Sequence, residues 1–364
     1  MEFESTDDGF RIVEEYNASL SKKIMFMAVL AVALLLVICY ACTIGARDID
    51  ILSIPGLIID HIMGAQYEYG TAEWWDDFII WNERMPRVLM ACVAGASLAI
   101  CGAAVQSLMN NPIADPYTMG ISSGASFGAV LAIVLGFSFA SSSGTYGISI
   151  NAFIFGMIPV GIVILLSRFV RMTPVTLILV GVAISQFFGS LSTVVMMNAE
   201  EGTLQAAYLW QVGSLSGATW SELPMMTFFL VIGAIALSIV SWKFNVMTLG
   251  DDAAKTLGVN TEVFRIIALT LTALMTMSIV AYTGIIGFVG IIAPHIVRYI
   301  IGSDNKYVMP ASLLSGAILL LVADTVARLF IYESVPVGAV MSFIGAPIFI
   351  YLVVKKNSLF KGAY

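Results

Sequence analysis

The chain has 364 residues, of which 59% are hydrophobic and 11% are charged, and its mean hydropathy is +0.94. Because an average soluble domain carries about 25% charged residues, this composition excludes a soluble globular protein and predicts an integral membrane protein. The formal net charge of −7 argues against nucleic acid as a partner. Apolar runs recur along the whole length, so we expect one polytopic membrane domain.

The first apolar run, residues 24–44, contains no charged residue and follows a polar stretch that ends in Lys22 and Lys23. A signal peptide would have a shorter apolar core and a small-residue cleavage site, so this run predicts a retained membrane-spanning helix. The lysines place residues 1–23 in the cytoplasm as a tail. We expect the transmembrane domain to cover 24–354 and a second cytoplasmic tail to cover 355–364.

Nine further apolar runs are long enough to span a membrane, and eight of the ten runs contain no Asp, Glu, Lys or Arg. The third and the eighth are short and rich in Gly and Ser. The pattern predicts an all-α polytopic membrane protein with ten transmembrane helices, at residues 24–44, 88–108, 119–136, 148–167, 175–197, 224–242, 266–282, 284–301, 308–330 and 337–354.

The distribution of positive charge supports this count. Ten helices threaded from a cytoplasmic N-terminus place thirteen Lys and Arg residues inside and four outside, the latter being Arg47, Arg84, Arg87 and Arg328. Because cytoplasmic loops of membrane proteins carry an excess of Lys and Arg, both termini are predicted to be cytoplasmic and the protein to lie in the cell membrane.

Two polar loops are expected on the outer side. Residues 45–87 carry Trp74, Trp75 and Trp81 among acidic residues, which predicts an interfacial segment anchored by aromatic rings. Residues 198–223 are too polar to span the membrane and are expected to lie in or on its outer face.

The third span repeats Gly120, Gly124 and Gly128 at every fourth position. Small residues at this spacing let helix backbones approach closely, so the pattern predicts close helix packing in a central position. Lining of a translocation path is the alternative that the pattern leaves open.

A polar stretch on the cytoplasmic side predicts a short helix over residues 248–257. Thr248 stands three residues before Asp251, which is a capping-box spacing, and Gly258 supplies a C-terminal stop. So short a helix is marginal alone and needs a surface to pack against. The face expected to make that contact carries Leu249, Ala253 and Leu257.

Few residues offer chemistry within the chain. The four cysteines lie in apolar runs without His or acids at metal-ligand spacing, so they are expected to be buried small side chains and no metal site is predicted. Residues 250–256 approach a phosphate loop, but Ala254 stands where the second glycine is needed. We predict no cofactor and no enzymatic activity in this chain, so another chain would hydrolyse any ATP.

Several motifs, in order and at characteristic spacing, resemble the FecCD permease family over about residues 80–355. They are Arg84-Met-Pro-Arg87, Gly102-Ala-Ala-Val-Gln106, Asn111-Pro-Ile-Ala-Asp-Pro116, Gly284-Ile-Ile-Gly-Phe-Val-Gly290 with Ala293-Pro-His295, Ala323-Asp324, and Gly345-Ala-Pro347. Members of this family are membrane subunits of ABC importers for ferric siderophores, haem and cobalamin. The resemblance implies the type II ABC importer permease architecture with ten helices.

The resemblance also implies partners: a second copy of the chain with the translocation path between the two, two cytoplasmic ATPase subunits that hold ATP and Mg, an external substrate-binding protein, and membrane lipid. Residues 244–262 resemble the coupling loop that contacts the ATPase. By that resemblance the coupling residues are Leu249, Gly250, Asp251, Asp252, Ala253, Ala254, Leu257 and Gly258.

Three outer arginines match positions where such permeases receive carboxylates from the binding protein, namely Arg84, Arg87 and Arg328. The alternative for Arg84 and Arg87 is contact with lipid headgroups, and for Arg328 an ion pair with Asp324 four residues earlier on the same helix.

Two other classes of protein are weighed against this reading. An ion-coupled secondary transporter would carry a relay of buried acids or histidines, and a membrane-embedded enzyme would need a polar catalytic cluster. The sequence offers neither. The substrate is not readable, because carriers of siderophores, haem, cobalamin and oxyanions share these motifs.

Overall fold

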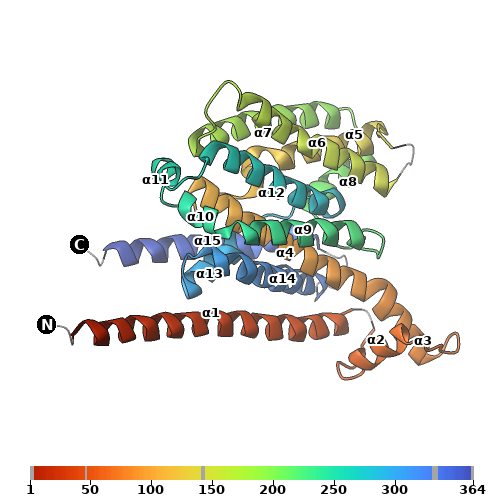
Figure 1. The fold of residues 1–364 in the computed structure, drawn as a ribbon. Coiled ribbons are helices and arrows are strands. Elements are labelled where there is room, and N and C mark those ends of the chain that lie inside the picture. The colour runs from red at the N-terminus through yellow and green to blue at the C-terminus, as the bar shows by residue number, and fades with distance from the viewer. Residues whose placement is uncertain (1–3, 46, 141–143, 330–334, 362–364) are drawn as a thin grey trace.

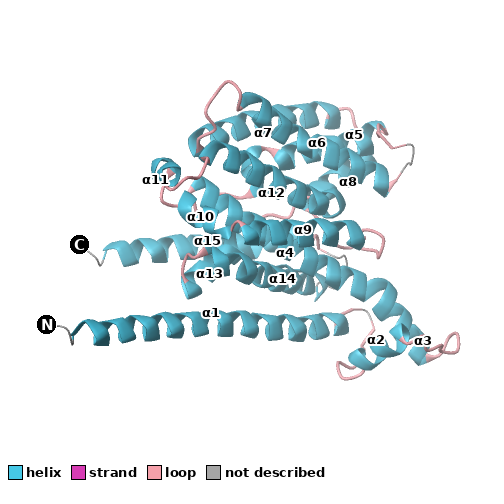
Figure 2. Ribbon diagram, in the orientation of Figure 1, coloured by secondary structure: helices cyan, strands magenta, loops and turns pink. Residues whose placement is uncertain are grey.

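The structure is a computed structural model, and it describes residues 4–45, 47–140, 144–329 and 335–361. This part of the chain consists of helices and their connections, without a strand (Figure 2). The all-α prediction is confirmed.

The helices follow one another through the chain with short connections. The first half contains α1 (Glu4–Thr43), α2 (Ile54–Ile62), α3 (Ala72–Ile79), the π-helical turn η1 (Ile80–Arg84), α4 (Met85–Met109), the 3₁₀ turn η2 (Pro116–Met119), α5 (Ile121–Leu135), α6 (Thr145–Leu166) and α7 (Pro174–Met196). The second half contains α8 (Glu201–Val212), α9 (Leu223–Ile239), α10 (Ser241–Met247), α11 (Asp251–Thr256), α12 (Thr261–Thr283), α13 (Val289–Ile301), α14 (Asn305–Leu329) and α15 (Val337–Lys361).

Each of the ten predicted spans has a counterpart among the described helices. Six helices are long and apolar enough to cross a membrane: Leu20–Thr43, Ala72–Met109, Thr145–Leu166, Pro174–Met196, Thr261–Thr283 and Asn305–Leu329. The predicted sixth span is α9 and α10 together, which meet at a 60° bend. The third, eighth and tenth are the shorter apolar helices Ile121–Leu135, Val289–Ile301 and Val337–Tyr351.

The long helices run between two ends of the molecule (Figure 1). Both chain termini and α11 lie at one end, which we call the α11 end; α2 and α3 lie at the other, which we call the α2 end. The residues predicted to form the N-terminal tail, from Glu4 onward, continue α1 rather than forming a separate segment.

The predicted outer loop 45–87 is more ordered than expected. It contains α2 and α3, and α3 continues through η1 into α4, so that residues 72–109 form one helix of 38 residues. A π-helical turn inserts an extra residue into a helix without breaking it, and such turns are frequent at functional sites. The turn ends at Arg84, one of the predicted site residues.

The centre of the bundle is α4, and the edge is α1. In the most apolar window of the helix that contains α4, 83% of the residues are buried, compared with 6% for α1. Glycines of α4 explain its close contacts: a Cβ on Gly102 would lie 1.9 Å from the carbonyl oxygen of Gly290 in α13, and one on Gly95 would lie 2.2 Å from that of Gly316 in α14. Lipid does not drive helices together as water does, so such backbone contacts are a main source of association.

Replacing Gly102 by alanine tests this packing. Gly102→Ala should lower the free energy of unfolding by about 1–3 kcal/mol, because the new methyl group overlaps the backbone of α13. The measurement is the thermal unfolding midpoint of the detergent-purified protein. The control is Gly161→Ala in α6, where a Cβ has open space; an equal loss of stability in both variants would contradict the packing argument.

Candidate functional site

The helix predicted over 248–257 is present but shorter, as α11, and a turn over 248–250 separates it from α10. Gly250, with φ of +94°, separates α10 from α11 and makes no side-chain cap. The hydroxyl of Thr248 donates to the carbonyl of Asn245 at 2.7 Å, inside the end of α10. The predicted capping box is therefore wrong, because Thr248 caps the C-terminal end of α10 and Gly250 stands at the N-cap of α11. The stop at Gly258 is confirmed, since its φ is +84°.

Three apolar side chains in and beside α11 are exposed in the single chain. Leu249 is 64% exposed, Leu257 is 58% exposed, and Ala253 lies on the exposed side with them. Ala254, by contrast, is fully buried against the bundle. The side chains predicted to contact a partner thus face away from their own chain, while Ala254 anchors α11 to it.

An arginine outside the predicted set anchors α11 to the bundle. Arg265, near the start of α12, is 1% exposed, and its Nη2 lies 2.6 Å from Oδ1 of Asp251. It also donates to the backbone carbonyls of Met172 at 3.0 Å and Leu108 at 3.4 Å. α11 is therefore tied to three other parts of the chain through one guanidinium. The sequence signal for this contact is weak, because an Arg in a first helical turn ordinarily faces water.

A polar cavity of about 320 Å³ lies beside α10 at the α11 end. It is lined by Gln106, Ser107, Asn110, Asn111, Pro112, Thr248, Arg298 and Ser303. The connection from α4 to α5 forms one wall, and it continues to Asp115, which caps η2 by accepting the N–H of Thr118 at 3.1 Å. Burial raises the pKa of Asp115 to about 6.

Two of the predicted outer arginines share one buried aspartate. Asp324 of α14 is fully buried, 2.9 Å from Arg87 and 3.1 Å from Arg328. The predicted pair between Asp324 and Arg328 is confirmed. The contact with Arg87, on α4, joins residues 237 positions apart and could not be read from local spacing. The cluster carries a net positive charge, because two guanidiniums share one carboxylate.

The third predicted arginine, Arg84, is 4% exposed and bonds to the end of α1 and the segment after it. Its Nη1 donates to the carbonyls of Cys42 at 2.6 Å and Thr43 at 3.0 Å, and its Nη2 donates to the carbonyl of Arg47. These three acceptors are backbone carbonyls without charge, so the positive charge of Arg84 adds to that of the neighbouring cluster.

Arg328 has spare hydrogen-bonding capacity. Among the described residues its buried Nη2 finds no acceptor, although Nη1 donates to the carbonyl of Ile44 at 3.2 Å. The side chain lines a cavity of about 300 Å³ at the α2 end, together with Thr43, Ile44, Gly45, Asp48, Ile49 and Leu329. A buried guanidinium without a full set of acceptors can take an additional anionic group.

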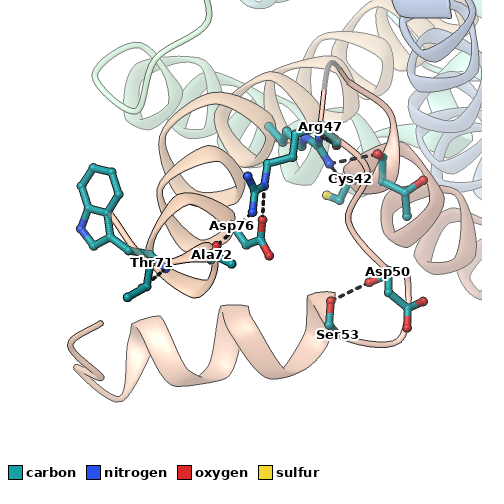
Figure 3. A network of polar contacts seen from close by, with 10 residues as sticks. Cys42, Arg47, Asp50, Ser53, Thr71, Ala72 and Asp76 are labelled. Carbon is teal, nitrogen blue, oxygen red and sulfur yellow. Dashed lines mark hydrogen bonds and ion pairs between the residues drawn. The ribbon is translucent and has the colours of Figure 1, made fainter. Parts of the chain in front are cut away.

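Further contacts at the α2 end join α2, α3 and η1 to one another and to the segment before α9. Arg47, before α2, reaches Asp76 on α3 at 2.5 Å (Figure 3). Trp81 stacks on His61 of α2 with ring centroids 4.1 Å apart and lies 4.9 Å from Trp220. The indole N–H of Trp220 donates to the carbonyl of Trp81 at 2.8 Å. The two predicted outer loops are thus joined to each other.

The predicted glycines lie at helix contacts. A Cβ on Gly124 would lie 2.5 Å from the carbonyl oxygen of Phe155 in α6, and one on Gly128 would lie 2.4 Å from that of Asn151. Gly120, with φ of +80°, lies where α5 begins, against Ile184 of α7. These positions fit the packing interpretation.

A large cavity of about 620 Å³ opens at the α2 end between α5, α6, α8 and α12. None of the residues that line it is charged, and its polar groups are mostly hydroxyls. They are Ala132, Ile133, Gly136, Ser138, Gly144, Gly147, Ile148, Ala206, Leu209, Trp210, Ser214, Ser216, Gly217, Tyr282 and Thr283.

Comparison with known proteins places these features in a family. The sequence profile of the FecCD transport family matches residues 33–355. The chain is 40% identical over 352 residues to a Methanocaldococcus jannaschii protein named as an ABC transporter permease, covering 94% of this chain and 98% of that protein. It is 37% identical over 280 residues to the hemin transport system permease protein HmuU of Yersinia pestis, covering 76% and 84% of the two chains.

A solved structure has the same fold. An inward-facing conformation of a transporter described as metal-chelate type superposes with a TM-score of 0.79 and 28% sequence identity. The match covers 90% of this chain and 98% of that one.

Proposed function

Because the chain belongs to the FecCD transport family, we propose that it is the permease subunit of an ABC importer for a metal-chelate substrate. The observation that carries the proposal is the similarity, over 90% of the chain, to a transporter of the metal-chelate type. The uncharged cavity at the α2 end suits a carrier that need not bind its cargo tightly, since an external binding protein would capture it.

In this proposal the α11 end is cytoplasmic, as the excess of Lys and Arg in the loops at that end favours. Two copies of the chain enclose the translocation path, and two separate ATPase subunits bind ATP and Mg and hydrolyse the ATP at the α11 end. An external binding protein delivers the substrate at the α2 end.

The ion-coupled secondary transporter is the weaker alternative. Such a carrier needs acids or histidines free to exchange protons or ions near the middle of the membrane. Asp324 is instead paired with two arginines near the α2 end.

A substrate panel tests the proposed function. The relatives carry hemin, ferric citrate, cobalamin and molybdate according to their names, so these four are the probes. Proteoliposomes that contain the permease, reconstituted with its partner ATPase and binding protein, should take up at least one of these substrates only when ATP is supplied. Uptake that proceeds without ATP but follows an imposed ion gradient would support the alternative instead.

The exposed face of α10 and α11 is the proposed ATPase contact. It combines Leu249, Ala253 and Leu257 with the exposed Asp252 and with Gly258. Burial of one leucine side chain at an interface contributes about 1.5–3 kcal/mol. Two such leucines therefore account for much of a stable contact, and Arg265 transmits its movement to the bundle by holding Asp251.

Replacing these leucines by aspartate should release the ATPase. Leu249→Asp or Leu257→Asp should weaken co-purification of the ATPase subunits about tenfold or more, because each places a charge in the apolar contact. Membrane insertion should not change, since both side chains are exposed in the chain. Leu52→Asp, at an 84% exposed leucine of the α2 end, is the control. If ATPase recovery is the same for all three variants, the coupling assignment is wrong.

Docking of the binding protein is proposed at the α2 end, on the side of Arg84, Arg87 and Arg328. The excess positive charge of the cluster favours an acidic partner. Arg328 is the best candidate for direct contact, because its Nη2, beside a cavity, has no acceptor within the described ranges of the chain. Arg84 and Arg87 would act through the electrostatic field, since their hydrogen bonds are made inside the chain.

An arginine substitution tests the docking proposal. Arg328→Gln should weaken binding of the binding protein by about three- to tenfold and reduce the dependence of that affinity on salt, as expected for one lost charge contact. Arg47→Gln removes the same charge from the same end but at a side chain paired with Asp76, and it should have a smaller effect. Equal effects of the two variants, measured by surface plasmon resonance, would exclude a specific role for Arg328.

A further inference from the structure

Gln106, near the end of α4, bonds to both ends of α13. Pro294 lies inside α13 and has no N–H for the carbonyl of Gly290 one turn earlier. The amide of Gln106 supplies a donor instead, with Nε2 3.2 Å from the oxygen of Gly290 and 3.3 Å from that of Ile291. Its Oε1 accepts a hydrogen bond from Arg298 in the last turn of α13. The side chain of Gln106 thus connects the two halves of α13 across Pro294, and helices commonly bend at a proline.

A chain of hydrogen bonds leads from Arg298 to α10. Nη2 of Arg298 donates to Oγ of Ser107 at 3.2 Å, and that hydroxyl lies 2.9 Å from Oδ1 of Asn305 at the start of α14. Asn245 of α10 completes the chain. Its Oδ1 accepts from the backbone and side-chain amides of Asn305 at 2.8 and 2.9 Å, and its Nδ2 donates to Asp304 at 2.8 Å.

The two middle members of this chain of hydrogen bonds are inaccessible to water, and its ends, Arg298 and Asn245, are partly buried. Ser107 and Asn305 are 2% and 1% exposed. Polar groups that lose their partners in such surroundings are not compensated by water, so the hydrogen bonds resist separate movement of the helices that they join. A displacement of α10 is therefore passed on to α4, α13 and α14.

The segment that leads into α13 starts at the wall of the 620 Å³ cavity. The segment between α12 and α13 begins after Thr283, whose carbonyl accepts the N–H of Ser214 at 2.8 Å. Both residues line the 620 Å³ cavity. The adjacent Gly213 accepts the N–H of Gly338 at the start of α15 at 3.1 Å. Movement of α13 thus reaches the cavity wall and α15.

We infer that Gln106 and Asn245 are positioning residues for transport, which carry displacement of α10 and α11 to α13 and so to the cavity at the α2 end. Asn245 connects α10 to the bundle, and Gln106 keeps α13 rigid across its proline so that the displacement is transmitted. This inference rests on the proposed function, because the displacement comes from the ATPase subunits.

Hydrogen–deuterium exchange tests the inference without knowledge of the substrate. The permease, in complex with its ATPase subunits in lipid nanodiscs, is compared without nucleotide and with ATP plus vanadate. In the wild type, exchange should differ between the two states both in peptides that cover 248–258 and in peptides that cover 284–301. Asn245→Ala should keep the first response and reduce the second by about half or more.

Two substitutions of Gln106 separate its contacts. Gln106→Leu removes both, and Gln106→Glu keeps an oxygen for Arg298 but removes the donor to Gly290. Both should speed exchange of the amides in 289–298 about fivefold or more without nucleotide, because opening of α13 at Pro294 becomes easier. Thr270→Val is the control, since that hydroxyl donates to the carbonyl of Ile266 in its own helix, at 2.8 Å. Thermal unfolding midpoints identify variants that are merely destabilised.

The outcomes distinguish failure of the proposed transmission through Asn245 and Gln106, called the relay below, from failure of the proposed function. A wild-type response at 284–301 in Asn245→Ala, or unchanged exchange in both Gln106 variants, would overturn the relay while the response at 248–258 persists. Absence of any nucleotide response at 248–258 in the wild type would instead overturn the proposed function, and the relay with it.

Discussion

The close approach of α4 to α13 and α14 is the contact on which the other features depend. Gly102 and Gly95 let the α4 backbone touch the carbonyls of Gly290 and Gly316. In lipid, apolar side chains gain little by leaving one neighbour for another, so helix association relies on such close packing and on hydrogen bonds between helices. Only at this distance can the side chain of Gln106 reach the carbonyl that Pro294 leaves without a donor.

Charged groups within the bundle are also held by contacts between distant segments. Arg87 and Arg328 share Asp324 at the α2 end, and Arg265 holds Asp251 at the α11 end. An isolated charge is costly in such surroundings, whereas a paired or hydrogen-bonded one is tolerated. Each cluster also joins distant segments, so the groups that are expensive to bury are the ones that fix the two ends of the bundle.

The two ends differ in what they present to partners. The α11 end exposes Leu249 and Leu257. The adjoining helix α11 is attached to the bundle through buried Ala254 and through the ion pair of Asp251 with Arg265. The α2 end holds buried arginines and, separately, an aromatic group in which Trp81 contacts both His61 and Trp220. An apolar exposed face and a recess lined by Arg328 and Asp48 suit different partners, which agrees with the proposed importer, in which an ATPase binds at one end and a binding protein at the other.

Local properties were readable from the sequence, and long-range contacts were not. Hydropathy over about 20 residues determines whether a helix can span lipid, and this predicted all ten apolar segments, because each depends only on its own composition. The pair of Asp324 with Arg328 was predictable from four-residue spacing.

The capping box at Thr248 was wrong because of the turn at Gly250. Glycine permits the positive φ of this turn but does not require it, and the turn separates α10 from α11. The contacts of Arg87 with Asp324, of Arg265 with Asp251 and of Gln106 with Gly290 were decided only by the tertiary structure. The residues next to a side chain in the sequence do not determine which distant carbonyl or carboxylate the folded bundle brings to about 3 Å from it.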